Sequence, residues 1–107
     1  WFRMSENHEY LWPGFGENLR ALRWVLSRVH GEVDARETEI GYLPYAKDID
    51  ISGLDVTPAT MEELLSVDRE GWKNATEGQK EFFAKFGDRM PQSMWQEHED
   101  LKRRLSM

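Results

Sequence analysis

Apolar side chains recur every three or four residues along most of this chain, which predicts a mainly helical fold. Between residues 19 and 29 they form a single stripe, with Asn18 as a candidate N-cap and Gly31 just beyond the last turn. The stripe consists of Leu19, Leu22, Val25, Leu26 and Val29. We therefore expect an amphipathic first helix.

Three further helices are predicted downstream. A short one starts at Thr57 and Pro58, because a capping hydroxyl followed by proline is typical of a helix N-terminus. A third is capped by Asp68 and stopped by Gly87, and a fourth follows Pro91. Their predicted inward residues are Met61, Leu64 and Leu65 in the second, Trp72, Ala75, Gln79, Phe82, Phe83 and Phe86 in the third, and Trp95, Leu101 and Leu105 in the fourth.

The first residues follow another pattern. Aromatic-rich runs at 1–3 and 9–12 flank a polar stretch, which predicts a short β-hairpin. Residues 13–16, Pro-Gly-Phe-Gly, then form a loop, and residues 32–56 are irregular with an extended stretch at 40–44. The expected fold is mainly α, with about four helices behind an aromatic hairpin. We divide the chain into a hairpin and loop segment, 1–18, and a helical portion, 19–107.

Composition limits the possible functions. The 107 residues include 39% hydrophobic ones, enough for one small domain, and the net charge of -6 disfavours binding to nucleic acid. No apolar run is long enough to span a membrane, and cysteine is absent, so we expect a cytoplasmic protein without membrane partners. Because the sequence opens on Trp1 and Phe2 rather than methionine, we interpret it as one C-terminal fragment, 1–107, of a longer chain.

Metal sites are not predicted in this segment. Its histidines, His8, His30 and His98, are too widely separated to form a helical metal pair, and we interpret them as surface residues. Residues 48–53 imitate the start of an EF-hand loop, but Ala59 occupies the position that requires a bidentate glutamate.

Aromatic residues are unusually dense near the N-terminus. Five of them precede residue 16, beside the amide of Asn18, and the adjoining glycine-rich turn lacks the lysine of a phosphate-binding loop. These five are Trp1, Phe2, Tyr10, Trp12 and Phe15. They are consistent either with a local hydrophobic cluster or with a flat slot in which a planar base stacks and an amide contacts its edge. The residue types alone leave both interpretations open.

The order of these residues resembles a known signature. Residues 1–3, Trp-Phe-Arg, followed by residues 11–18, Leu-Trp-Pro-Gly-Phe-Gly-Glu-Asn, and then Arg20 are similar to the guanine loop of GTP-dependent phosphoenolpyruvate carboxykinases. Residues 40–44, Ile-Gly-Tyr-Leu-Pro, and 61–66, Met-Glu-Glu-Leu-Leu-Ser, resemble later family motifs. The resemblance covers the whole chain, closely before residue 20 and loosely afterwards.

The resemblance implies a site for guanine. Phe2 and Phe15 would enclose the base, Tyr10 would close the slot, and Asn18 would contact the base edge. Supporting positions would be Trp1, Trp12, Gly14 and Gly16. Two positions depart from the family pattern, since Tyr10 replaces phenylalanine and Leu19 replaces serine.

The resemblance also implies a reaction. Members of the family are lyases (decarboxylases) of gluconeogenesis that convert oxaloacetate and GTP into phosphoenolpyruvate, GDP and carbon dioxide, using manganese or magnesium. Their metal ligands and phosphate-binding loop belong to earlier parts of a larger α/β nucleotide-binding enzyme. We therefore expect no catalytic or metal-binding residue in this segment, inactivity when it is isolated, and partners consisting of the rest of the parent enzyme and a guanine nucleotide. Self-association of the isolated segment is a further expectation.

Two other functions compete with this interpretation. The first is a non-catalytic helical module that binds a protein partner through its apolar stripes. The second is a small stand-alone nucleotide-binding protein. The missing phosphate loop argues against the second, whereas only the motif run argues against the first.

Overall fold

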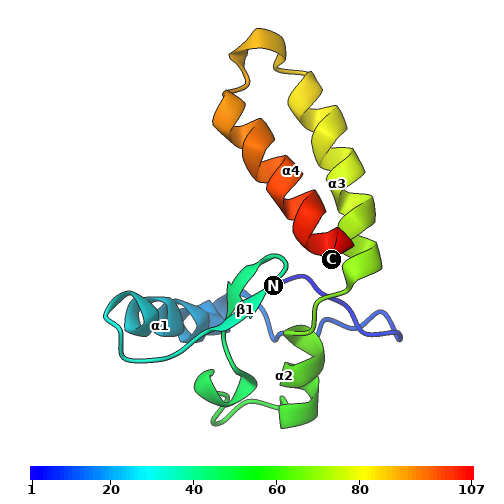
Figure 1. The fold of residues 1–107 in the computed structure, drawn as a ribbon. Helices are drawn as coiled ribbons and strands as arrows, with labels where there is room; N and C mark the ends of the chain where they lie inside the picture. Colours follow the sequence, from blue (N-terminus) through cyan, green and yellow to red (C-terminus); the bar gives the residue numbers. More distant parts are fainter. The chain divides into compact units, whose positions relative to one another are not determined.

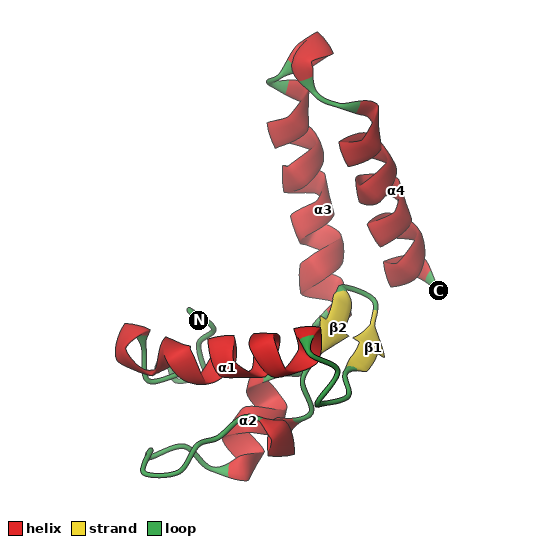
Figure 2. Cartoon of the chain, turned by 90° about the vertical axis from the view of Figure 1, so that its left-hand side faces the viewer, coloured by secondary structure: helices red, strands yellow, loops and turns green.

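A computed structural model describes residues 1–107. The chain is mainly helical, as predicted, with three helices of at least 12 residues and one of 7 residues (Figures 1 and 2). The elements are α1 (Asn18–Val29), β1 (Arg36–Thr38), β2 (Gly41–Leu43), α2 (Pro58–Leu64), α3 (Arg69–Ala84) and α4 (Gln92–Ser106), with single 3-10 turns η1 (Phe15–Glu17), η2 (Ala46–Asp48) and η3 (Gly87–Arg89). They form two compact units, one from residues 1–37 and 42–66 and the other from 38–41 and 67–107.

Three predicted helix starts are confirmed. The hydroxyl of Thr57 accepts a hydrogen bond from the backbone N–H of Thr60 at 3.1 Å, and Pro58 is the first residue of α2. Asp68 accepts from the N–H of Gly71 at 3.0 Å before α3. Pro91 immediately precedes α4. In each case the residue at the boundary satisfies a local backbone requirement, so short-range sequence is sufficient to predict it.

The start of α1 differs from the prediction. Its N-cap is Glu17, and Asn18 is the first helical residue. The amide oxygen of Asn18 accepts a hydrogen bond from the Trp12 indole instead of a backbone N–H. The prediction that Asn18 caps the helix was therefore wrong, because the indole of Trp12 occupies its oxygen.

The predicted N-terminal hairpin is reduced to one bridge. Met4 and Tyr10 form an isolated antiparallel bridge, and Leu11 donates its N–H to the carbonyl of Arg3 at 2.9 Å. The only two-stranded sheet pairs β1 with β2, overlapping the extended stretch expected at 40–44. A two-stranded ladder has little stability of its own, and here Leu11 and Trp12 turn into the core while Pro13 ends the pairing.

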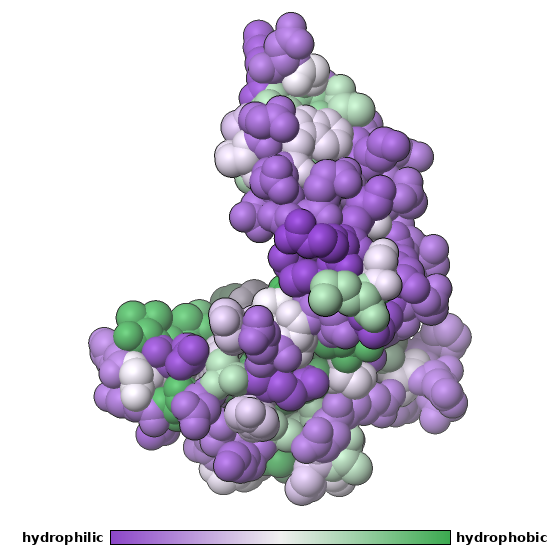
Figure 3. Space-filling model, viewed as in Figure 1, coloured by the Kyte–Doolittle hydropathy of each residue, from purple (hydrophilic) through white to green (hydrophobic).

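The first unit is organised around three buried side chains, Trp12, Ile49 and Met61. The side chain of Trp24 on α1 packs against them. The partly buried residues around this cluster are Ala46, Ile51, Leu54, Val56, Leu64 and Leu65. The apolar stripe predicted on α1 is exposed along its whole length, from Leu19 to Val29. Figure 3 shows hydrophobic atoms gathered over the region where Figure 1 draws α1.

The second unit is an antiparallel pair of helices, α3 and α4, which lie side by side (Figure 2). Rings from the two helices make edge-to-face contacts, with the centroids of Phe83 and Trp95 separated by 5.4 Å. The guanidinium of Arg104 donates to the carbonyl of Glu39 at 2.8 Å, and Arg69 forms an ion pair with the Glu39 carboxylate at 3.3 Å. These contacts connect the 38–41 turn with the helices of the same unit.

The inward face predicted for α3 is confirmed only in part, and the prediction for His98 was wrong. The packed side of α3 contains Trp72, Thr76, Gln79 and Phe83, whereas Ala75, Phe82 and Phe86 are exposed. The buried side is therefore rotated from the predicted one. His98, interpreted as a surface histidine, is only 3% exposed and lies against Phe83 and Trp95. Helix pairing decides both outcomes, because α3 carries aromatic residues on more than one face and only the face that meets Trp95 and His98 of α4 is buried.

Candidate functional site

The loop before α1 has a backbone that depends on glycine. Gly14 adopts φ 120 and ψ -167, a conformation that other residues rarely adopt. Its carbonyl accepts a hydrogen bond from the N–H of Glu17 at 3.0 Å, which closes the η1 turn. Phe15 follows at the tip of this turn and is 93% exposed. The loop therefore holds an aromatic ring in solvent rather than in the core.

Two other predicted stacking residues come together. The rings of Phe2 and Tyr10 have centroids 6.4 Å apart and an interplanar angle of 69°. Both remain open to solvent, at 80% and 59% exposure. The ring of Phe15 makes no aromatic pair with either of them. The structure thus groups Phe2 with Tyr10 and leaves Phe15 separate on the following loop.

Asn18 is held by a buried tryptophan. The indole N–H of Trp12 donates to the Asn18 amide oxygen at 2.9 Å, and Trp12 is only 4% exposed. No protein group accepts a hydrogen bond from the amide nitrogen of Asn18. Sequence reasoning selected both residues but did not foresee this bond between them.

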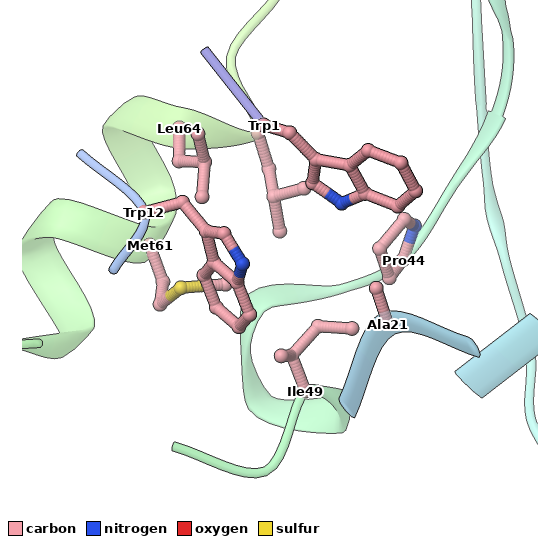
Figure 4. Close-up of a pocket in the computed structure, with 8 residues that line it drawn as sticks. Trp1, Trp12, Ala21, Pro44, Ile49, Met61 and Leu64 are labelled. Atoms are coloured by element: carbon pink, nitrogen blue, oxygen red, sulfur yellow. The ribbon is translucent and has the colours of Figure 1, made fainter. Parts of the chain in front are cut away.

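Trp1 lies beside an apolar cavity of about 190 Å³ in the first unit. Figure 4 shows the indoles of Trp1 and Trp12 on its wall, together with Ala21 and Pro44. The remaining lining residues are Ile49, Met61, Leu64 and Leu65. Of the residues predicted for the site, only Trp1 and Trp12 line this cavity.

Arg20 anchors the end of the loop. Its guanidinium donates to the Glu17 carboxylate at 2.7 Å and to the backbone carbonyl of Asp50 at 2.8 Å. Hydrogen bonds from the hydroxyl and backbone N–H of Ser52 hold the pKa of the Asp50 carboxyl below its usual range, aided by the charges of Arg20 and Arg23. The sequence contained the Glu17–Arg20 spacing, typical of a helical ion pair, but no role was derived from it.

Comparison with known proteins decides the family. A profile of the phosphoenolpyruvate carboxykinase C-terminal P-loop domain matches residues 1–104. The chain belongs to the GTP-dependent phosphoenolpyruvate carboxykinase family. The phosphoenolpyruvate carboxykinase [GTP] of Arthrobacter sp. (strain FB24) is 42% identical to this chain over 99% of its length. The protein of the same name from Neocallimastix frontalis is 44% identical to it over 98% of its length. The resemblance inferred from the motifs is thereby confirmed.

This chain spans only part of those carboxykinases. It covers 17% of the length of the Arthrobacter protein and 17% of that from Corynebacterium kroppenstedtii, to which it is 40% identical. The chain thus corresponds to about one sixth of each of these proteins. No helix of the chain has an apolar stretch long enough to cross a lipid bilayer.

The motif resemblance implies that GTP-dependent carboxykinases use manganese or magnesium. The residues of this chain are not suited to bind such an ion. No group of three or more His, Asp or Glu side chains is arranged to hold an ion. His8 and His30 are exposed, and His98 belongs to the other unit. Asp48 and Asp50 share their pocket with two arginines, Arg20 and Arg23, whose charges disfavour a cation there.

Proposed function

We propose that residues 1–18 form the guanine-binding part of a GTP-dependent phosphoenolpyruvate carboxykinase. In the proposed reaction, the full enzyme converts oxaloacetate and GTP into phosphoenolpyruvate, GDP and carbon dioxide. The observation that carries the proposal is the exposure of Phe2, Tyr10 and Phe15 in the same short segment as an amide with an unpaired NH₂ group, Asn18.

Stacking would supply most of the affinity for the base. Large apolar rings are normally buried, so three rings exposed within 15 residues indicate a surface that is covered when a ligand binds. Aromatic stacking contributes about 1–3 kcal/mol per base. We propose that Phe2 and Phe15 contact the two faces of the base and that Tyr10, already against Phe2, closes one side.

The rest of the polypeptide would carry the phosphate and metal chemistry. This segment contains neither a phosphate-loop lysine motif nor a cluster suited to a metal. The chain positions the base end of the nucleotide, and by itself it would be inactive. Under this proposal the exposed apolar stripe of α1 packs against other parts of the same enzyme. The same stripe was the reason for considering a protein-interaction module.

Nucleotide preference in the full-length enzyme tests the proposal. Asn18→Ala should lower the preference for GTP over ATP without changing the affinity for metal, because Asn18 belongs to no group of side chains arranged to hold an ion. Asn74→Ala, at an exposed position of α3, is the matched control and should keep the wild-type preference. An unchanged ratio of kcat/KM for GTP and ATP in Asn18→Ala would contradict the proposed site.

A further inference from the structure

The hydrogen bond between Trp12 and Asn18 determines which end of the amide faces outward. A carboxamide has an acceptor end and a donor end of nearly the same shape, whereas an indole N–H can only donate. The oxygen of Asn18 therefore faces Trp12. If the amide were turned over, its NH₂ would oppose the indole N–H and leave a buried donor without an acceptor. The observed orientation is thus strongly preferred.

The indole is fixed by its surroundings. Trp12 packs in the core cluster with Ile49 and Met61, and it is followed by Pro13 at the start of the loop. Asn18 is held in the first turn of α1, two residues before the anchored Arg20. Neither partner is free to reorient without disturbing the core or the helix. The amide nitrogen of Asn18 consequently presents only N–H donors to a ligand.

Purine bases differ at the atom that such a donor would meet. Guanine carries an acceptor oxygen, O6, where adenine carries a donor amino group, N6. We propose that Trp12 is a positioning residue for base specificity, which orients Asn18 so that the site accepts 6-oxopurines and disfavours adenine. This inference rests on the proposed function of the loop. It predicts that ITP, which retains O6 but lacks the 2-amino group, is used like GTP.

The chain offers a matched control for this role. Trp24 packs against the same core cluster as Trp12, and its indole N–H is buried without any hydrogen-bond partner. Trp24→Phe therefore removes the same indole atoms from the same core without affecting Asn18. A general effect of core packing would appear in both tryptophan variants, whereas an effect on amide orientation would appear only in Trp12→Phe.

The experiment compares Trp12→Phe, Trp24→Phe and Asn18→Ala in the full-length enzyme, with KM and kcat measured for GTP, ITP and ATP. We expect Trp12→Phe to reduce the ratio of KM for ATP to KM for GTP by about ten-fold, the size of one lost polar discrimination. The substitution should change KM rather than kcat, because Asn18 contacts the base and not the reacting phosphate. Calorimetry should give dissociation constants of GDP and ADP that show the same loss of discrimination, in a measurement that requires no catalysis.

The outcomes separate this inference from the proposed function. If Asn18→Ala loses discrimination while Trp12→Phe keeps it, the role of Trp12 is wrong and the guanine site stands. If Trp24→Phe loses as much discrimination between GTP and ATP as Trp12→Phe, the loss comes from altered core packing and the inference also fails. If none of the three variants changes the ratio, the proposed guanine site fails, and the inference fails with it.

A second substitution leaves Trp12 in place and avoids any folding defect of Trp12→Phe. In Asn18→Asp, one carboxylate oxygen still accepts from Trp12, and the other replaces the outward NH₂ with an acceptor. This acceptor would repel O6 and suit N6, so the preference for GTP should fall below that of Asn18→Ala. A preference equal to or above that of Asn18→Ala would overturn the orientation argument.

Discussion

The guanidinium of Arg3 joins the N-terminal segment to a residue 63 positions later, donating to the hydroxyl of Ser66 at 3.0 Å. A second nitrogen donates to the carbonyl of Leu64, the last residue of α2, at 3.2 Å. Carbonyls at a helix C-terminus have no partner within the helix, so Arg3 satisfies one of them. The segment that carries Phe2 is thereby fixed to α2 within the first unit.

Arg3→Ala should destabilise the first unit by about 1 kcal/mol, because the hydrogen bonds to Leu64 and to the hydroxyl and carbonyl of Ser66 are lost from a largely exposed site. Urea unfolding of the chain, followed by tryptophan fluorescence, measures the change. Arg89→Ala is the control, since the side chain of Arg89 is exposed and makes no ion pair or hydrogen bond. Equal midpoints for the two variants would show that the Arg3 contacts contribute nothing measurable.

Gly14 and Gly16 should respond differently to substitution by alanine. At Gly14 the backbone angle φ 120 strains any residue with a Cβ atom, so Gly14→Ala should destabilise the loop by about 1–3 kcal/mol. Gly16 has no such angle, and a Cβ built there meets nothing within 4 Å. We expect Gly16→Ala to fold with wild-type stability in thermal unfolding. Comparable losses in both variants would contradict this distinction.

The isolated chain should self-associate through the exposed face of α1. Leu19, Leu22, Leu26 and Val29 form an apolar surface that no part of the chain covers. Leu26→Glu places a charge in this surface and should shift the chain toward monomer in sedimentation velocity. Asn74→Glu adds the same charge to an exposed site on α3 and should leave association unchanged. A wild-type chain that stays monomeric at high concentration would refute the prediction.

Guanosine should bind the isolated chain about as well as GTP. The proposed site contacts only the base, and the net charge of -6 provides no attraction for phosphates. Stacking and one amide contact are offset by the ordering of ligand and loop, so we expect dissociation constants in about the millimolar range. Ligand-observed NMR measures both affinities. Micromolar binding of GTP that guanosine does not reproduce would reveal a phosphate site within this chain.

Asp50 should titrate below the usual range of an aspartate. The pKa of its carboxyl is lowered chiefly by hydrogen bonds from Ser52, and then by the charges of Arg20 and Arg23. A carboxyl with a lowered folded pKa stabilises the fold above its unfolded pKa, and this stabilisation is lost as pH falls through the folded value. Carbon-detected NMR titration should show the pKa of Asp50 rising toward its usual range in Ser52→Ala. An unchanged pKa in that variant would mean that the Ser52 contacts are not its cause.

Local sequence was sufficient for the starts of α2, α3 and α4. Thr57, Asp68 and Pro91 act on the backbone within a few positions, so short-range rules predicted their helices correctly. The motif run around Gly14 was specific enough to indicate the family that the comparisons confirmed. The positions selected for guanine binding remain a prediction, because their roles depend on a ligand.

Tertiary structure decided the features that depend on how separate segments of the chain pack together. Asn18 suits an N-cap by residue type, yet a buried indole takes its oxygen, and this bond fixes the outward end of its amide. His98 is polar by type, yet its place against Phe83 buries it. Aromatic residues occupy several faces of α3, and the pairing with α4 alone selects the buried one. Periodicity describes one helix at a time, whereas burial and hydrogen bonding depend on which surface of another element meets it.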